Sequence, residues 1–436
     1  MAWLWFCGYE GGPVRDEVAA LGAKARSHLH QDCWGGGSES VDTGYTIQDG
    51  DAGADVHCGR YAVRLVGLGL GDLAAFRGHA LAITTKPVVF SVRHQQIGFD
   101  SAPVAADLNS YYGVAACWKD QISPPANAAV EITFKLVSIS PLKMVYTVHL
   151  NNTLKITGTT QFDLPMSSGS WNWLQVSVDG SGNLELFVND TSEGTGSGAT
   201  GTLEPYILPE AVMLAGGKGS GDKSARHKFC DMGVSDSASP APTARPTSST
   251  VIIGHQPVAD VSGEDGWTGD PDASNQYRNW DDENDDCAVA ADKNSPPSVG
   301  ATQVSEIANA PGSPTIQAVR IMYATAEMPT LQIRHTLRLN VGSGFQEYAN
   351  PLYGFWNTAA SPYEMWVGQH FAQTPEATPQ NWTLALFNAL QAGVKAVDTT
   401  RHVCELYAIA IGTGLTRPAK TPCPPAAAGR SQVIII

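Results

Sequence analysis

The chain has 436 residues, including 44 glycines and 27 prolines, and its formal net charge is −15. This length exceeds one ordinary hydrophobic core and favours two β-rich domains with many turns. The acidic balance excludes binding of DNA or of an anionic bilayer through the overall electrostatic field, and no apolar run is long enough to predict a transmembrane helix.

The N-terminal residues 2–7 are apolar, but they are too few for a signal sequence and no basic residue precedes them. We therefore expect no Sec export. The eight cysteines include no Cys-x-x-Cys pair, so most are expected to be thiols in a cytosolic chain. Cys33 with Cys58, or Cys7 with Cys230, are conceivable disulfides that the sequence leaves open.

Nitrogen and sulfur donors gather near the N-terminus, namely His28, His30, Asp32, Cys33, His57 and Cys58. Zinc prefers four such ligands, but this spacing matches no zinc finger or knuckle. Loop residues without metal are the favoured interpretation. A short helix over residues 14–25 is the most that this region predicts.

Alternation of apolar and polar residues predicts a series of short antiparallel strands in the first half, at 61–66, 88–92, 112–118, 130–136, 144–150 and 154–156. Residues 169–190 predict a β-hairpin. Leu174, Val176 and Val178 form its apolar face, whereas Gln175 and Ser177 are expected to face water. This hairpin pattern resembles that of the concanavalin A-like (laminin G-like) sandwich family, and the resemblance implies a fold rather than an activity.

Residues 216–224 resemble a phosphate-binding loop, but Asp222 interrupts the required Gly-Lys-Ser ending, so we expect a flexible loop. Residues 235–250 are rich in proline and serine and predict a solvated linker with nothing to bury. Two independently folding halves would follow, and proteolysis near Arg245 would then separate them.

In the second half, strands are expected at 318–324, 331–339 and 404–411. One helix is expected over residues 383–392, preceded by Asn381 and ended by Gly393 as a left-handed cap.

The second half also resembles a domain that recurs in structural proteins of tailed bacteriophages. The resemblance rests on residues 258–267, 277–286, 316–320, 382–383, 387–390 and 393–394, and on an N-terminal opening at residues 1–12. It implies a virion component that is made in the host cytoplasm and is assembled onto a particle.

Three kinds of residue are candidates for a chemical or binding role. Five carboxylates crowd one run, Asp281, Asp282, Glu283, Asp285 and Asp286; a solvated loop is favoured over a cation site or a docking surface for a basic partner. Glu131 and Glu185 are isolated acids rather than the paired carboxylates of a glycosidase, and no nucleophile elbow is present. Six aromatic residues could stack on sugars but are expected in the core or at its rim: Trp34, Tyr111, Tyr112, Trp118, Trp171 and Trp173.

The sequence thus predicts an all-β protein of two β-sandwich (jelly-roll-like) domains, the second with one short helix. The expected boundaries are 1–235, a linker at 236–250, a second domain at 251–416 and a Pro/Ala-rich tail at 417–436. The expected function is structural and non-enzymatic, with no cofactor and no nucleic-acid or membrane partner. A lectin-like module that binds host glycans is the alternative. An apolar tip, Val433, Ile434, Ile435 and Ile436, is the expected contact with other virion proteins or with copies of the chain, although an edge strand or a frayed end fits it too.

Overall fold

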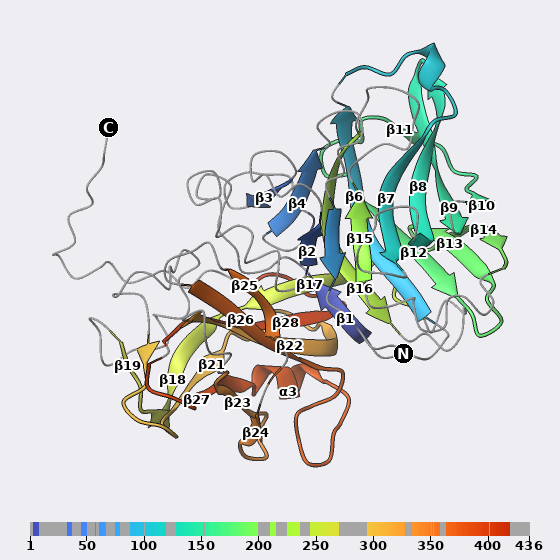
Figure 1. The fold of residues 1–436 in the computed structure, drawn as a ribbon. Helices are drawn as coiled ribbons and strands as arrows, with labels where there is room; N and C mark the ends of the chain where they lie inside the picture. The colour runs from blue at the N-terminus through green and yellow to red at the C-terminus, as the bar shows by residue number, and fades with distance from the viewer. Residues whose placement is uncertain are drawn as a thin grey trace, which may run out of the picture.

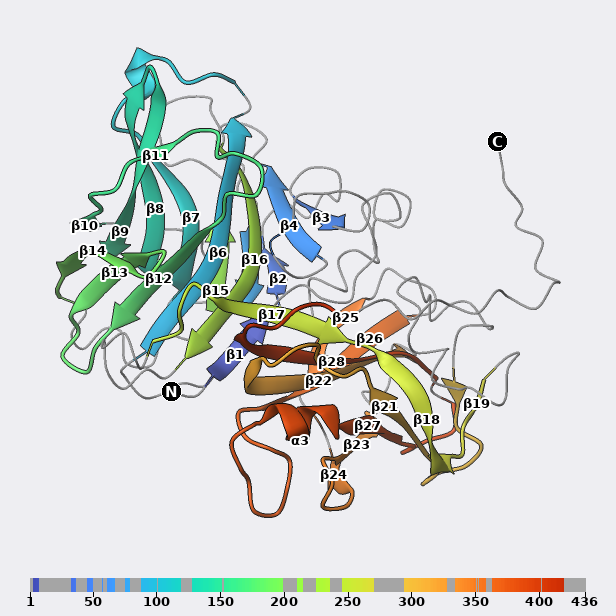
Figure 2. The ribbon, with the colours of Figure 1, turned by 180° about the vertical axis from the view of Figure 1, so that it is seen from behind.

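The computed structural model describes residues 3–7, 33–36, 45–49, 57, 61–66, 75–78, 88–99, 101–118, 128–150, 153–198, 210–214, 225–235, 245–269, 294–327, 334–349, 351, 353–357, 363–400 and 402–418. These residues form an all-β protein with four antiparallel sheets, which pair into two sandwiches (Figures 1 and 2). The predicted fold class is confirmed.

The first sandwich consists of sheets A and B. Sheet A has the strand order β14 (Thr191–Gly196), β13 (Leu184–Val188), β12 (Asn172–Val178), β6 (Val88–Phe99), β16 (Ala225–Ser235), β4 (Tyr61–Val66) and β3 (Tyr45–Asp49), and β1 (Trp3–Cys7) also pairs with β16. Sheet B has the order β10 (Thr153–Thr157), β9 (Leu142–Leu150), β8 (Ala128–Ile139), β7 (Tyr111–Trp118), β15 (Glu210–Leu214), β5 (Ala75–Gly78) and β2 (Cys33–Gly36), with β11 (Phe162–Asp163) beside β9. A short 3₁₀ helix, η1 (Ala105–Asp107), precedes β7.

The second sandwich consists of sheets C and D. Sheet C has the order β19 (Thr268–Gly269), β20 (Asn294–Ser295), β28 (Val403–Thr413), β22 (Thr315–Glu327), β26 (Tyr363–Phe371) and β25 (Tyr353–Asn357), with β17 (Thr250–His255) beside β28. Sheet D has the order β18 (Pro257–Asp265), β21 (Thr302–Ile307), β27 (Gln391–Lys395), β23 (Thr336–Asn340) and β24 (Gln346–Tyr348). One short helix, α3 (Leu384–Asn388), lies against this sandwich (Figure 1).

The predicted hairpin over residues 169–190 is present as β12 and β13. Leu174 pairs with Val188, and Val176 pairs with Leu186, so the apolar face points into the first core as expected. The expected wet face is wrong, because Gln175 and Ser177 are buried too. The chain after residue 244 contacts Gln175: its Nε2 group donates to the Pro246 carbonyl oxygen at 2.9 Å.

The predicted helix exists but is shorter than expected. Thr383, rather than Asn381, is its N-cap, because the Thr383 hydroxyl accepts from Leu386 N at 3.2 Å. Gly393 is not a helix cap, since it lies within β27 and pairs with Val304 and Arg338 on either side. Strand β27 begins only three residues after α3 ends. Sheet D requires a residue without a side chain at position 393.

Replacing Gly393 by alanine is expected to destabilise the second sandwich by about 3 kcal/mol, at the upper end for overpacking. A Cβ atom at this position would lie 2.5 Å from Val304 Cα and closer still to the Gln303 carbonyl oxygen. Urea denaturation measures the effect. Gly180→Ala is the matched control, because no atom lies within 4 Å of its Cβ position. Equal stability of the two variants would contradict the tight strand packing.

The central strands β22 and β28 of sheet C carry buried residues on both faces, which explains their continuous apolar runs. Along β28, Leu406, Ala408 and Ala410 face the core of the second sandwich. The alternate residues Tyr407, Ile409 and Ile411 form a third core on the other face. Trp3 and Phe6 of β1 belong to this third core, which therefore joins the two sandwiches (Figure 2). We call it the junction core.

Polar contacts reinforce the junction core. Trp3 Nε1 donates to Gln317 Oε1 at 2.8 Å, and His370 Nε2 donates to the Trp3 carbonyl oxygen at 2.6 Å. The Phe6 ring packs edge-on against His370 with ring centroids 5.3 Å apart. Strand β1 thus pairs with a strand of the first sandwich while its side chains pack on the second.

The described end of the expected linker, residues 245–250, is only partly solvated: Arg245, Pro246 and Thr250 are buried, whereas Ser249 is exposed. Arg245 is 4% exposed and Thr250 is fully buried. The Arg245 guanidinium lies 3.6 Å from the centre of the Phe187 ring and bonds to Gln175 Oε1. The Phe187 ring and the Gln175 side chain therefore hold Arg245 in the folded protein, although the composition of the segment suggested exposure. We accordingly expect no protease access at Arg245 in the folded protein.

Candidate functional site

The junction contains a charged cluster centred on Asp231. This residue lies at an irregularity of β16 and has φ +45°, which places its carboxylate between the sandwiches. Asp231 Oδ2 accepts from Arg93 Nε at 3.2 Å and from His57 Nδ1 at 3.1 Å, and Asp231 Oδ1 accepts from Ile252 N at 3.1 Å.

Arg93 extends the cluster to the second sandwich. Its Nη2 donates to the carbonyl oxygens of Ser248 and Thr250, each at 2.8 Å, and its guanidinium lies 4.8 Å from the centre of the Trp173 ring. Both charged groups are almost fully buried, so each depends on the other for compensation. The cluster fixes the backbone that leads from one sandwich to the next.

The same cluster brings together the ligand types of a metal site. His57, Cys230 and Asp231 offer ligand atoms that all lie within 4.8 Å of one another. However, the Arg93 guanidinium already compensates the Asp231 carboxylate and would repel a cation at this point. The buried ion pair of Arg93 and Asp231 therefore explains the cluster as a structural link between the two sandwiches. Cys230 is buried there, and the side chain of Cys7 lies outside the described set, so the conceivable Cys7–Cys230 disulfide stays open.

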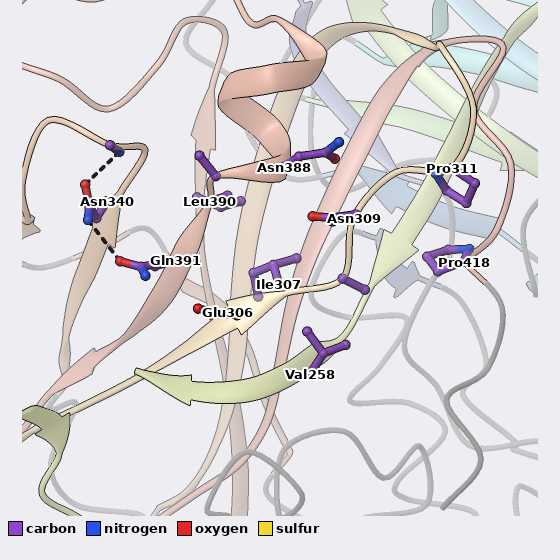
Figure 3. A pocket seen from close by; sticks show the side chains of 13 residues that line it. Val258, Glu306, Ile307, Asn309, Pro311, Asn340, Asn388, Leu390, Gln391 and Pro418 are labelled. Carbon is purple, nitrogen blue, oxygen red and sulfur yellow. Dashed lines mark hydrogen bonds between the residues drawn. The ribbon is translucent and has the colours of Figure 1, made fainter. Parts of the chain in front are cut away.

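A pocket opens on the second sandwich, beside the end of α3 and the adjoining strand ends of sheet D (Figure 3). Its volume is about 640 Å³, and side-chain amides are frequent in its lining. We call it the amide pocket; it is lined by Val258, Glu306, Ile307, Ala308, Asn309, Pro311, Asn340, Gly342, Asn388, Ala389, Leu390, Gln391 and Pro418.

Four segments position the polar side chains of the amide pocket. Asn388 is the last residue of α3, and Gln391 is the first residue of β27. Asn340 ends β23, and Asn309 follows β21. The turn from α3 into β27 thus places Asn388 and Gln391 near the ends of β21 and β23, the two strands that flank β27 (Figure 3).

Hydrogen bonds fix three of these amides. Asn388 Oδ1 accepts from Ala310 N at 2.9 Å. Asn340 Nδ2 donates to Gln391 Oε1 at 2.9 Å, while Asn340 Oδ1 accepts from Gly342 N at 2.8 Å. The pocket is therefore largely preformed, and it presents hydrogen-bonding groups rather than a nucleophile with a base.

Several predicted site residues lie outside the described part of the chain. They are the acidic run Asp281, Asp282, Glu283, Asp285 and Asp286, the apolar tip Val433, Ile434, Ile435 and Ile436, and the phosphate-loop-like residues 216–224. The possible short helix at 14–25 does too, as do His28, His30, Asp32 and Cys58. Of the donors near the N-terminus, only His57 has a described side chain, and the carboxylate it bonds to, that of Asp231, lies 174 positions away in the sequence.

The two isolated acids do not share a cleft. Glu131 is buried on β8 of sheet B, whereas Glu185 lies on β13 of sheet A and accepts from the Ser192 hydroxyl at 2.6 Å. Their placement on different sheets gives no pair of facing carboxylates. The expected absence of enzymatic activity stays a prediction.

The aromatic residues follow the expected division between core and rim where their side chains are described. Tyr112 and Trp173 are buried, whereas Tyr111 and Trp171 are partly exposed. Tyr111 packs edge-on against His149 with ring centroids 5.0 Å apart. Trp34 and Trp118 lie in strands, and their side chains are outside the described set.

Sequence reasoning missed every polar residue of the amide pocket. Asn388 and Gln391 lie in the stretch that was predicted as helix and cap, but nothing local to the sequence connects them with Asn309 or Asn340. Only the antiparallel order β21-β27-β23 brings these segments together. One local signal was available: a predicted helix that ended at Asn388 would have placed Gln391 outside the helix.

No protein-family model matches the chain, and no curated protein sequence matches it. In the described residues, no helix combines the length and apolar character that a membrane crossing requires.

Comparison with solved structures finds β-rich proteins of several kinds. The botulinum neurotoxin type G receptor binding domain is 11% identical over 54% of this chain, with a TM-score of 0.30, and the match spans 47% of that domain. The VIP36 exoplasmic/lumenal domain in its Ca²⁺/Man3GlcNAc-bound form is 15% identical over 44% of this chain and 83% of its own, with a TM-score of 0.29. An alginate lyase from Pseudomonas aeruginosa is 12% identical over 40% of this chain and 82% of its own, with a TM-score of 0.27. At these identities and TM-scores, the matches assign neither a ligand nor an activity to this chain.

Proposed function

We propose that this chain is a non-enzymatic structural protein of a tailed-bacteriophage particle, made in the host cytoplasm and incorporated through protein–protein contacts. The observation that carries the proposal is the junction between the sandwiches. A buried core and a buried ion pair make the two sandwiches one unit, as a load-transmitting or spacing component of an assembly requires. The resemblance of the second half to domains of virion structural proteins supports the same proposal.

The proposal includes a mode of assembly. The four apolar residues Val433, Ile434, Ile435 and Ile436 follow a Pro/Ala-rich stretch and would contact a neighbouring subunit or another virion protein. Full burial of one such aliphatic side chain contributes about 1.5–3 kcal/mol. Burial of this tip in a partner would remove its apolar side chains from water and so stabilise the assembly.

Deletion of residues 432–436 is expected to leave the isolated protein folded and to reduce its incorporation into particles at least tenfold. Quantitative immunoblotting of purified particles measures incorporation, and circular dichroism confirms folding. A control deletion of residues 426–428 removes three alanines but keeps the tip. Unchanged incorporation of the first variant would reject the tip as the contact and direct attention to the exposed sandwich faces.

A lectin-like module that binds host glycans is the second candidate, and one observation favours it. The amide pocket concentrates side-chain amides and one carboxylate in a single concavity. Such groups form the paired hydrogen bonds that sugar hydroxyls require. The two candidates are compatible, because a virion protein can also carry a glycan site.

A further inference from the structure

We infer that the amide pocket on the second sandwich binds a neutral saccharide, with Asn309, Asn388 and Gln391 as donors and Glu306 as acceptor. This inference rests on the second candidate function and gives it a site, a ligand class and a set of contacts. The site lies at the α3–β27 turn and the adjoining strand ends of sheet D (Figure 3).

The amides present a defined hydrogen-bonding pattern before any ligand arrives. The side-chain oxygen Oδ1 of Asn388 already accepts from Ala310 N, which leaves the Asn388 Nδ2 group to donate. The side-chain oxygen Oε1 of Gln391 likewise accepts from Asn340 Nδ2, which leaves the Gln391 Nε2 group to donate. Because backbone and side-chain partners fix these orientations, binding costs little side-chain entropy.

Glu306 adds an acceptor to these donors, and Asn309 adds a further donor. Glu306 and Asn309 are exposed in the pocket, and their side chains make no hydrogen bond with another described residue. A sugar hydroxyl donates one hydrogen bond and accepts others, so adjacent hydroxyls match a carboxylate beside amide N–H groups. Glu306 would accept from one hydroxyl while the amide groups donate to its neighbours.

The charge of the pocket selects among saccharides. Among the described residues of its lining, Glu306 is the only ionisable one, and none is a lysine or an arginine. A uronate, sialate, sulfate or phosphate group would therefore meet a carboxylate without a compensating cation. A neutral hexose or N-acetylhexosamine meets no such penalty.

Apolar side chains in the lining provide a surface for the C–H face of a sugar ring. The lining includes the side chains of Pro311, Pro418, Val258 and Ile307 (Figure 3). The volume of about 640 Å³ falls in the range of small-molecule pockets. Since the described lining residues include no aromatic ring for stacking, we expect a single-site Kd on the order of 1 mM. Many copies on one particle would raise the effective affinity.

The experiment uses the full chain. It is screened on an array that carries neutral hexose and N-acetylhexosamine oligosaccharides beside uronate- and sialate-containing ones, and the strongest neutral oligosaccharide is titrated by calorimetry. Asn309→Ala is expected to weaken binding at least fivefold. Asn381→Ala, an exposed asparagine outside the pocket, is the matched control and is expected to bind as the unmodified chain does.

Glu306→Gln tests the selectivity, because it keeps an acceptor but removes the charge. This variant is expected to bind uronate-containing oligosaccharides that the unmodified chain rejects. The inference is overturned if no neutral oligosaccharide binds, if Asn309→Ala binds as tightly as Asn381→Ala, or if only acidic glycans bind. The virion role fails separately, through absence of the chain from particles, so the two results are distinguishable.

Discussion

Replacing Trp3 by alanine is expected to split the thermal unfolding of the full chain into two separate transitions. Trp3 is 1% exposed and fills the junction core together with Ile252, Met322 and Ile409. Its removal leaves a cavity and deletes the hydrogen bond to Gln317, at a cost of about 3–5 kcal/mol. Because this loss falls on the contact between the sandwiches, their coupling weakens more than either core does.

Differential scanning calorimetry measures this effect. The unmodified chain is expected to unfold in one cooperative transition, in which the calorimetric and van't Hoff enthalpies agree. Tyr111→Ala is the control, since it removes a partly exposed aromatic side chain from β7, away from the junction core. Two transitions in the unmodified chain, or one transition in the Trp3→Ala variant, would contradict a coupling role for the junction core.

Lowering the pH from 7 to 4 is expected to reduce the free energy of unfolding by several kcal/mol. Burial lowers the pKa of His227 to about 3, and it lowers the pKa values of His255 and His370 to about 4 each. The unfolded chain binds protons at these residues below pH 6.5, whereas the folded chain does not. Stability is therefore fully present above pH 6.5 and is lost as the pH falls towards 4, by roughly 1.4 kcal/mol per pH unit for each histidine.

Urea denaturation at several pH values between 7 and 4 measures this dependence. The His255→Gln variant can still donate to the Ala308 carbonyl oxygen, which accepts from His255 Nδ1 at 3.0 Å. Its free energy of unfolding is expected to depend less steeply on pH than that of the unmodified chain, by roughly one histidine's share. Parallel pH profiles for the two proteins would show that His255 does not titrate on unfolding.

The strands of both sandwiches could be predicted because their signals are local. Alternating apolar residues defined the hairpin at residues 169–190 and the strands around 130–136 and 144–150. Strand β22 could also be recognised, although the apolar residues on both of its faces indicated burial without showing what covers each face. The second face is covered by residues from the far N-terminus, and the contact between Trp3 and Gln317 spans 314 positions.

The errors share a physical cause, which is that tertiary contacts overrode local composition. Arg245 was expected in water because its neighbours are proline, serine and threonine, yet Phe187 and Gln175 provide a partner for each part of its side chain. Gly393 fits a helix cap by composition, but close packing against Gln303 requires the same residue in a strand. The amide pocket was missed because its residues converge only after sheet D has formed.

The most direct test of the proposed function is the composition of purified particles. Phage particles from a host that produces this chain should contain it in a fixed number of copies per particle, as quantitative mass spectrometry with labelled reference peptides would show. Peptides from both sandwiches should occur in equal amounts, because both sandwiches belong to one polypeptide chain. Absence from particles, or a copy number that varies between preparations and falls on washing, would contradict a structural role in the virion.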